Sequence, residues 1–391
     1  MTKDHKCLAP LVSIFIPYYN DENFLRKSID SVLTNNYENF ELILLNHACT
    51  DKSREIAHSY QDKRIIHIDM DSNYGAGGGI LFEKMLNVAS GKYIKPLCAD
   101  DILLPNGLIS LVSYMENNPE KSFAFGNIEY IDKDGIDLRD SWFNNRPFFS
   151  VHNNEIKCLQ LYMQGISFLP YIGSIIKRSA LKSVKINKTY IMMFDMSLWV
   201  SLLCKGYKIG YVNKLVCCYR ISEFQVSSIE NNSKACFLSY FETKTFYKLF
   251  FSISSIKLAK KLFPKSPFLS KLCKEEDIPF FVAYNIFIAR YMLDNAATFI
   301  DDLLNDKRAA KKLKNRFGYT VKEYRKDLRS FMTMESDGPK GTRFYEFKHK
   351  IYSTPSRSLG LGYLSFLIAR RIHAIVTFRS LREKHKRKYS L

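Results

Sequence analysis

The chain has 391 residues, of which 46% are hydrophobic, and carries a formal net charge of +19. This length exceeds one typical core and predicts two or three domains, while the hydrophobic fraction is normal for a globular protein. The positive charge is concentrated late in the chain, because residues 301–391 hold 23 Lys and Arg against 9 Asp and Glu. Such a basic tail favours contact with an anionic surface, either nucleic acid or phospholipid headgroups.

Hydropathy and cysteine usage predict a cytoplasmic protein. No run reaches the roughly 18 apolar residues that a membrane span requires, since residues 278–293 and 359–378 are both interrupted by Arg. The first ten residues are short and polar, so we expect no signal peptide. The nine cysteines form no CxxC pair, and Cys217 and Cys218 are adjacent. We therefore expect free thiols in a reducing compartment.

Apolar runs and helical spacings alternate through the first half of the chain. The expected strands are residues 11–16, 40–45, 64–68, 92–97, 123–131, 172–176, 208–212 and 215–219. The expected helices are residues 21–33 with Asn20 as N-cap, 51–60, a helix ending at Ala89, 106–116, 156–163, 177–181 and 192–204. Residues 139–147 read as a loop. Short connections between strands and helices predict an α/β fold with a mostly parallel, doubly wound sheet.

The character of the sequence changes after about Glu230. Strand signals fade, and basic, Phe-rich stretches with helical spacing follow. The segment SIENNS (residues 228–233) reads as a linker. We therefore predict an α/β domain over residues 1–230 and a mainly helical region over residues 231–391, with a break near residues 336–341.

Two adjacent carboxylates, Asp100 and Asp101, follow the strand expected at residues 92–97. Open α/β sheets bind ligands at the carboxyl ends of their strands. Neighbouring carboxylates disfavour each other's ionisation, and a hard cation such as Mg²⁺ or Mn²⁺ relieves that repulsion and accompanies a diphosphate. The alternative is that an Asp only caps the following helix.

Two polar turns are expected at the same sheet edge: IPYYN (Ile16–Asn20) and NYGAGGG (Asn73–Gly79). Glycine lets backbone approach a ligand, and a helix N-terminus attracts phosphate. The alternative is a flexible turn without a ligand. The glycine-rich turn is not a P-loop, since no GK[ST] follows, and it comes after the third strand, unlike the dinucleotide fingerprint.

Two charged residues far downstream lie in apolar surroundings. Asp195 begins a helix within MMFDMSLWV, where a carboxylate requires a partner or a chemical role; the alternative is an N-cap. Arg220 follows the apolar strand LVCCY and could reach a phosphate; the alternative is an ordinary surface charge at a strand end.

In this order, the segments resemble glycosyltransferase family 2 over roughly residues 11–228. The matching segments are IPYYN, NFELILLNHACTDKS, NYGAGGG, ASGKYIKPLCADDILLP, FDMSLW and GYKIGYVNKLVCCYR. The resemblance implies the nucleotide-sugar-binding GT-A fold. It does not extend over the C-terminal region.

The resemblance also implies roles for single residues. Asp100 and Asp101 match the end of the family's DxDD segment, which holds Mn²⁺ or Mg²⁺ at the donor's diphosphate. Asp195 matches the Asp of the family's ED-x-x-L-W motif, its usual catalytic base. Arg220, with Gln225 and Ser227, matches a YR…Q-x-S stretch near the diphosphate. The residues expected to bind the nucleotide-diphospho-sugar are Pro17, Tyr19, Asn46, Asp51, Asn73, Asp100 and Arg220.

The chain departs from the family pattern at three places. Asn46 and His47 stand where the family usually has two Asp, which weakens any inference that the base is uracil. Cys98 stands at the first acid of DxDD, and Phe194 replaces the Glu before the base. No QxxRW motif follows Asp195, which argues against a processive polymerase.

We therefore expect an inverting, non-processive transfer of a sugar from a nucleotide-diphospho-sugar to a hydroxyl of a saccharide or lipid-linked saccharide. The composition is typical of an AT-rich bacterial genome, and such enzymes build capsule, O-antigen or lipooligosaccharide. The alternatives are a degenerate, non-catalytic sugar-nucleotide binder, a nucleotidyltransferase, and a basic nucleic-acid-binding protein. We expect no nucleic-acid partner, because no recognition motif is present. A nucleotidyltransferase would carry a basic, Gly-rich loop where this chain has IPYYN.

The basic end of the chain predicts a second property. A Lys- and Arg-rich amphipathic helix over residues 363–388 can lie on an anionic leaflet. The enzyme would then be peripheral on the inner face of the cell membrane. The alternative is a solvated helical cap on the catalytic domain.

Overall fold

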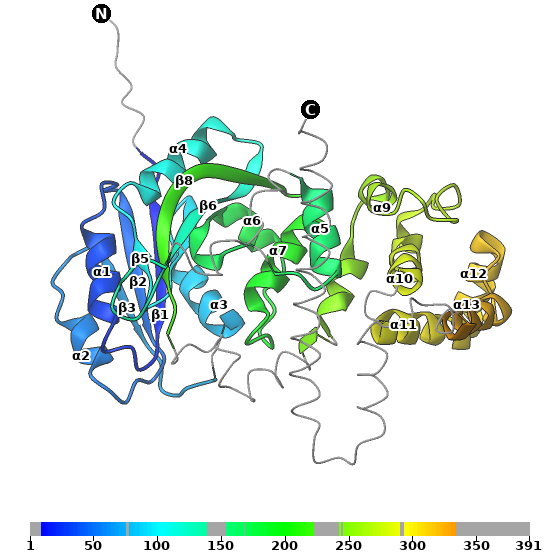
Figure 1. Ribbon diagram of the computed structural model, residues 1–391, viewed down its shortest axis with the longest axis horizontal. Helices are drawn as coiled ribbons and strands as arrows, with labels where there is room; N and C mark the ends of the chain where they lie inside the picture. The colour runs from blue at the N-terminus through cyan, green and yellow to red at the C-terminus, as the bar shows by residue number, and fades with distance from the viewer. Residues whose placement is uncertain are drawn as a thin grey trace, which may run out of the picture.

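The computed structural model describes residues 9–75, 78–138, 154–167, 169–222, 242–243, 245–289 and 293–333. A mixed sheet of eight strands forms its centre, in the order β3-β2-β1-β4-β7-β6-β8-β5 (Figure 1). The strands are β1 (Val12–Tyr18), β2 (Phe40–Asn46), β3 (Ile65–Asp69), β4 (Tyr93–Pro96), β5 (Ile102–Leu103), β6 (Lys121–Ile131), β7 (Ser174–Lys177) and β8 (Lys208–Arg220).

The strands that lead into the predicted site are parallel. Strand β1 pairs with β2 and β4, and β2 pairs with β3, all in parallel. In this register Tyr18 lies opposite Asn46, and Asn46 lies opposite Asp69. The carboxyl ends of these strands therefore meet at one edge. Strands β1 and β2 are buried along almost their whole length, which explains their continuous apolar runs.

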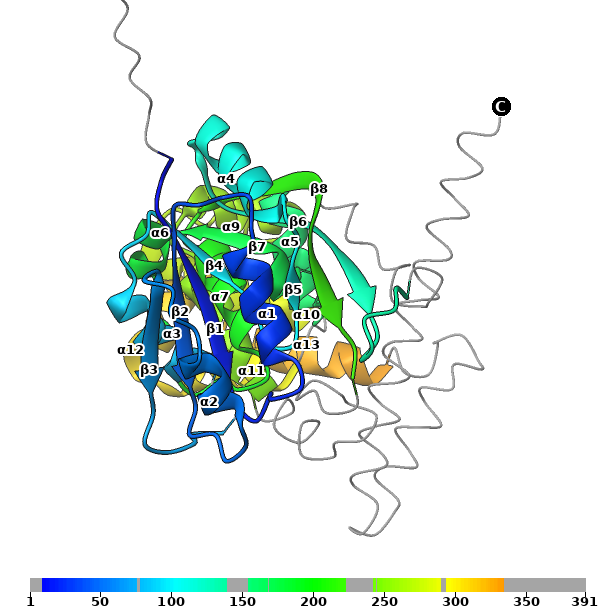
Figure 2. The same ribbon diagram turned by 90° about the vertical axis from the view of Figure 1, so that its left-hand side faces the viewer.

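Helices cover both faces of this sheet (Figures 1 and 2). In the α/β part they are α1 (Leu25–Leu33), α2 (Ser53–His58), α3 (Gly78–Val88), α4 (Gly107–Asn117), α5 (Glu155–Met163), α6 (Arg178–Ser183) and α7 (Phe194–Cys204), with a 3-10 turn, η3 (Tyr171–Gly173). Apolar residues of α1, α2 and α4 form one buried core, and those of α3, α5, α6 and α7 contribute to the other.

The second core continues into the C-terminal helices. These are η4 (Tyr247–Ser252), α9 (Ile256–Leu262), η5 (Glu275–Asp277), α10 (Ile278–Ile288), α11 (Leu293–Asn305), α12 (Lys307–Phe317) and α13 (Val321–Thr333). Phe246 and Phe250 at η4 are fully buried in the same cluster as Trp199 of α7. The helical region is therefore packed onto the α/β part through shared apolar side chains. In the described part of the chain, no helix combines the length and the hydropathy expected of a membrane span.

The predicted fold class is confirmed: an α/β sheet domain is followed by helices. Two details were wrong. Helix α1 begins at Leu25, and Asn20 is not its N-cap but adopts a left-handed backbone with φ 54°. The strands expected at residues 208–212 and 215–219 are one irregular strand, β8. Within the mixed sheet, strand β7 runs antiparallel to β4 and β6, a direction that the sequence did not indicate. The linker, the loop at 139–147, the break near 336–341 and the helix at 363–388 lie outside the described residues.

Candidate active site

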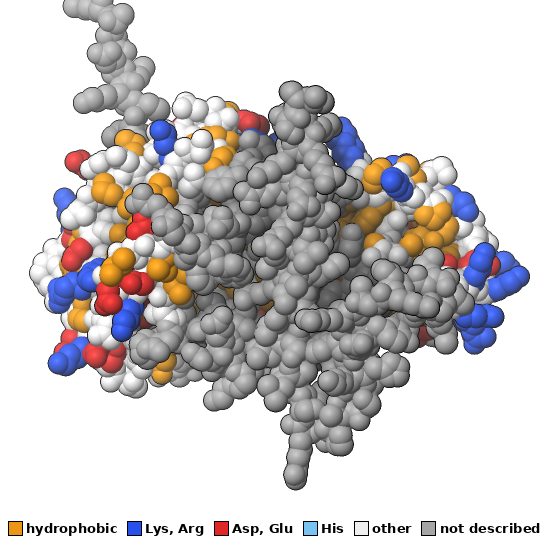
Figure 3. Space-filling view, viewed as in Figure 1, with side chains coloured by type: hydrophobic (Ala, Val, Ile, Leu, Met, Phe, Trp, Pro, Cys, Tyr) orange, Lys and Arg blue, Asp and Glu red, His pale blue; other side chains and the backbone are white. Residues whose placement is uncertain are grey.

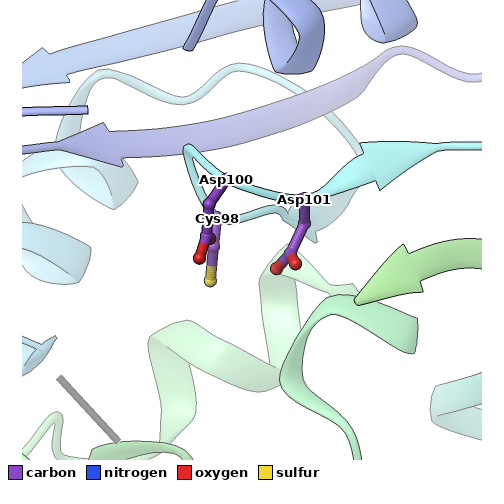
Figure 4. Close-up of side chains that lie close together, drawn as sticks. All are labelled: Cys98, Asp100 and Asp101. Carbon is purple, nitrogen blue, oxygen red and sulfur yellow. The ribbon is translucent and has the colours of Figure 1, made fainter. Parts of the chain in front are cut away.

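Three side chains gather after strand β4 and form what we call the acidic corner: Cys98, Asp100 and Asp101 (Figure 4). One candidate ligand atom from each residue lies within 4.8 Å of the other two. Neither carboxylate caps helix α4, whose N-cap position is Asn106. The helix-cap alternative for these acids is therefore wrong.

The carboxylate of Asp101 is fully buried. Its Oδ1 atom accepts a 2.8 Å hydrogen bond from the backbone N–H of Arg220. In the described part of the chain, no well-aligned hydrogen bond reaches its Oδ2 atom. Burial and the charge of Asp100 hold the pKa of Asp101 well above its usual range. A buried carboxylate whose second oxygen accepts no well-aligned hydrogen bond is suited to binding a cation.

Arg220 is 1% exposed and lies behind the acidic corner. Its Nε donates to the carbonyl of Asp100 at 2.8 Å, and its Nη1 donates to the carbonyls of Asp132 and Lys133 at 2.9 and 3.0 Å. The guanidinium also lies over the Phe24 ring. The surface-charge alternative is therefore wrong, because Arg220 is buried and its guanidinium links two backbone segments to strand β8. Its contact with a phosphate stays a prediction.

The turns after β1 and β2 are joined by side chains. Asn46 is 4% exposed; it donates to Asp69 Oδ1 at 2.8 Å and accepts from the N–H of Cys49 at 2.9 Å. Asp51 accepts from the N–H of Glu22 at 3.1 Å. Pro17 is half-buried at the end of β1. These contacts hold the two turns together at the edge where the register predicts the nucleotide pocket.

Aromatic rings surround His47 beside these turns. The His47 Nε2 atom accepts a hydrogen bond from the N–H of Tyr74 at 2.8 Å, and the two rings are nearly parallel. Tyr19 meets His47 edge-on at 6.1 Å between ring centroids. Tyr19 and Tyr74 are 45% and 54% exposed, so they present ring surface to a planar ligand.

One acid of this edge was missed in the sequence. Asp21 accepts a hydrogen bond from the N–H of Tyr19 at 3.0 Å. Burial raises the pKa of Asp21 to about 6, and the charges of Asp100 and Asp51 add to the rise. Asp21 is thus close to both predicted ligand-binding acids. A single Asp in a polar turn gives no local signal that would have singled it out.

The glycine-rich turn lies at the start of helix α3. Asn73 is exposed, and its Oδ1 accepts from the N–H of Gly75 at 2.7 Å. A Cβ on Gly79 would lie 1.9 Å from the carbonyl oxygen of Asn187, and one on Gly78 would lie 2.6 Å from Cβ of Phe194. These two glycines therefore let α3 approach the segment that leads into α7, a packing role independent of any ligand.

Asp195 lies in the first turn of helix α7 and is half-buried. Its Oδ1 accepts a 2.6 Å hydrogen bond from the N–H of Met196, and the N-cap position is Met193. The N-cap alternative is therefore wrong. Burial raises the pKa of Asp195 to about 6. Phe194 is 4% exposed and packs on Phe82 of α3.

Tyr171 of η3 connects Asp195 to the acidic corner. Burial holds the pKa of Tyr171 well above its usual range, and the charges of Cys98 and Asp195 raise it further. The Tyr171 ring meets Phe194 edge-on at 6.3 Å. Asp195 and Cys98 of the acidic corner are thus both close enough to affect the ionisation of one phenol, although they are far apart in the sequence.

The chain matches known proteins over this same region. Residues 13–185 match the model of glycosyl transferase family 2. An uncharacterized glycosyltransferase of Methanocaldococcus jannaschii is 30% identical over 243 residues, which cover 61% of this chain and 80% of the relative. The Escherichia coli protein WfaP, named UDP-Glc:alpha-D-GlcNAc-diphosphoundecaprenol beta-1,3-glucosyltransferase, is 28% identical over 218 residues, 56% of this chain and 80% of the relative.

A solved structure, that of Staphylococcus aureus TarS 1-349 in complex with UDP, has a TM-score of 0.45 and 15% identity over 82% of this chain and 91% of that chain. The sequence matches are the stronger finding. The chain belongs to glycosyl transferase family 2. It is an enzyme, a glycosyltransferase with an α/β catalytic domain and a helical C-terminal region.

Proposed function

We propose that the protein transfers a sugar, with inversion, from a nucleotide-diphospho-sugar to a hydroxyl group of a saccharide acceptor. The observation that supports this most is that Tyr171 is affected by both Asp195 and Cys98, while its ring meets that of Phe194, the neighbour of Asp195. A transferase of this kind requires a base at the acceptor and a site for the leaving diphosphate on the other side of the reacting carbon. The two groups of acids provide these two functions.

Asp195 is the proposed base. With a pKa of about 6 it is ionised at neutral pH, yet more basic than an ordinary Asp. Its carboxylate takes the proton of the acceptor hydroxyl while the hydroxyl oxygen bonds to the anomeric carbon. The bond from that carbon to the diphosphate oxygen breaks, and the nucleotide diphosphate takes the electron pair. Attack opposite the leaving group inverts the anomeric configuration.

The acidic corner fits a divalent cation. Asp100 and Asp101 offer carboxylate oxygens, the ligands that Mg²⁺ and Mn²⁺ prefer, and the Oδ2 atom of Asp101 is a buried acceptor. Burial and the two acids hold the pKa of the Cys98 thiol well above its usual range, so we expect a neutral, weak ligand there. A bound cation would supply positive charge to the diphosphate.

The proposed nucleotide pocket is the edge formed by the turns after β1 and β2. Tyr19 offers an exposed ring to the base, and Asn46 and Asp51 fix the turns around it. Asn73 and the α3 start close the same edge. Arg220 holds the backbone of Asp100 in place from behind.

We propose a lipid-linked saccharide acceptor for surface polysaccharide, made without processive elongation. The Escherichia coli relative named above acts, by its name, on a diphosphoundecaprenol-linked sugar. We therefore propose that the enzyme works in the cytoplasm, peripheral on the inner face of the membrane.

The described C-terminal helices carry a basic surface consistent with this location (Figure 3). Residues 245–274 contain seven Lys and no Asp or Glu. A shallow groove of about 650 Å³ is lined by Ile256, Lys257, Lys260, Lys261, Pro264 and Leu269. Apolar side chains between lysines suit anionic headgroups at a membrane surface. The basic residues after 333 would add to this attraction.

The proposal is tested first by release of nucleotide diphosphate from a donor panel of UDP-glucose, UDP-N-acetylglucosamine, UDP-galactose and GDP-mannose, with Mn²⁺. We expect turnover of at least one donor and calorimetric binding of its nucleotide diphosphate. Nucleotide binding without any turnover, with a range of saccharide acceptors present, would instead favour a degenerate, non-catalytic binder. This is the second candidate function, because Cys98 and the Asn46–His47 pair depart from the family pattern.

The membrane location is tested with vesicles of phosphatidylcholine with and without phosphatidylglycerol. We expect the full chain to bind only the anionic vesicles. Truncation after residue 360 should weaken binding, and K257E/K260E/K261E should weaken it further. Unchanged binding in both variants would reject the membrane role and favour a solvated helical cap.

A further inference from the structure

The carboxylate of Glu242 is buried against the start of helix α7. Glu242 does not belong to that helix and is far from Asp195 in the sequence. It is 7% exposed. It accepts hydrogen bonds from three successive backbone N–H groups: Ile191 at 2.6 Å, Met192 at 3.0 and 3.2 Å, and Met193 at 2.7 Å. An anion at the N-terminus of a helix satisfies unpaired N–H groups and complements the helix dipole.

The bonded segment is the one that places Asp195. Met193 is the N-cap residue of α7, and Asp195 follows it by two residues. The neighbouring Thr243 also donates to Met193 Sδ at 3.5 Å. Movement of the 191–193 backbone would therefore move the Asp195 carboxylate directly.

We infer that Glu242 is a positioning residue for Asp195: its carboxylate fixes the backbone at residues 191–193 and thereby aims the proposed base at the acceptor hydroxyl. This inference rests on the proposed function of Asp195. It gives the C-terminal region a part in the reaction, since Glu242 lies beyond the predicted boundary near residue 230.

The same contact adds a negative charge near the base. Burial is the main cause of the raised pKa of Asp195, and the charge of Glu242 adds to it. Among the described residues, other titratable groups in this region are Tyr162 on α5, Tyr171 on η3, Tyr190 beside Glu242, and the ion pair at 2.6 Å between Glu83 of α3 and Lys188. The phenols are neutral at neutral pH, and Glu83 is balanced by Lys188. Glu242 is therefore the anion expected to influence Asp195 in the wild-type enzyme.

Two substitutions separate position from charge in the full chain. Glu242→Ala removes all the N–H contacts, and we expect kcat to fall about 10- to 100-fold with little change in donor KM or in UDP binding with Mn²⁺. Glu242→Gln keeps a carbonyl acceptor but removes the charge. Because a nearby anion disfavours ionisation of Asp195, its removal should lower that pKa and move the acid limb of the kcat–pH profile to lower pH.

The control is Asp277→Asn, a buried acid at 4% exposure that precedes helix α10 and pairs with Arg316. We expect it to lower Tm without moving the pH profile. If Glu242→Gln folds and its acid limb coincides with the wild type, or if both Glu242 variants keep wild-type kcat, the inference is overturned. Asp195→Asn is measured in parallel. Full activity of that variant would overturn the proposed base itself. If Asp195→Asn is inactive, the base assignment stands, and the Glu242 variants alone decide the positioning role.

Discussion

The acidic corner and the start of helix α7 hold their carboxylates in different ways. Asp101 is fixed by the sheet, since its partner N–H belongs to strand β8 and the loop beside it is tied down by Arg220. Asp195 is fixed by a helix start whose preceding backbone is held by a carboxylate, Glu242, from the C-terminal region. One group of acids depends on the catalytic domain alone, and the other depends on a contact between the two parts of the chain.

This difference predicts different consequences of mutation. Loss of the side chain behind the acidic corner should reduce stability, because the Arg220 guanidinium donates to backbone carbonyls there. Loss of a residue at the α7 start should reduce turnover while the fold and the donor site persist. The following substitutions test this separation.

The largest effect is expected at the proposed base. Asp195→Asn removes the proton acceptor but preserves shape, so turnover should fall by about 10²- to 10⁴-fold. UDP binding with Mn²⁺, measured by calorimetry, should remain unchanged, because Asp195 is not among the residues proposed to bind the donor. Near-normal turnover with the enzyme's own donor and acceptor would show that another group is the base.

Arg220→Met should cause the largest loss of stability. It removes the side-chain donor of the carbonyls of Asp100 and Lys133, while the carbonyl of Asp132 keeps the N–H of Gly135. An orphaned polar group inside a protein costs about 1–3 kcal/mol. We expect a total of roughly 3–5 kcal/mol in urea unfolding, typical of a broken buried charge network. The control is Arg54→Met, which breaks an exposed ion pair with Asp69 and should leave the midpoint unchanged. Equal midpoints for both variants would contradict the structural role of Arg220.

Asp100→Ala should weaken the donor site without unfolding the chain. We expect metal-dependent UDP binding to weaken by roughly 100-fold or more, since even partners that only support a metal ligand contribute about 10- to 100-fold. Calorimetry with and without Mn²⁺ measures the effect. Asp62→Ala, in a surface pair with Arg64, should bind as the wild type does. Binding that is equally strong without Mn²⁺ in the wild type would argue against a metal at the acidic corner.

Local patterns predicted the strands and most helices well, because buried parallel strands and amphipathic helices repeat within a few residues. They also singled out Asp100, Asp101 and Asp195 as acids in unusual places. The antiparallel course of β7 was missed because strand direction depends on the whole topology. Tyr171 and Glu242 were missed for a similar reason: each acts through contacts with residues more than 20 positions away in the sequence, and such contacts leave no periodic signal.

The smallest effect is expected in the glycine-rich turn, where a packing role and a phosphate-binding role make opposite predictions. Gly79→Ala would force a Cβ against the carbonyl of Asn187, and overpacking of this kind costs about 1–3 kcal/mol. If packing is the reason for the glycine, Tm falls while UDP affinity per folded molecule is retained. If the turn binds the diphosphate, the loss of UDP binding free energy is larger than the loss of unfolding free energy. Gly135→Ala is the control, because its φ of 92° is strained but no atom lies within 4 Å of the added Cβ. Gly79 itself has no positive φ, so a larger loss in Gly79→Ala than in this strained but clash-free variant would assign the loss to the contact between α3 and the segment that leads to Asp195.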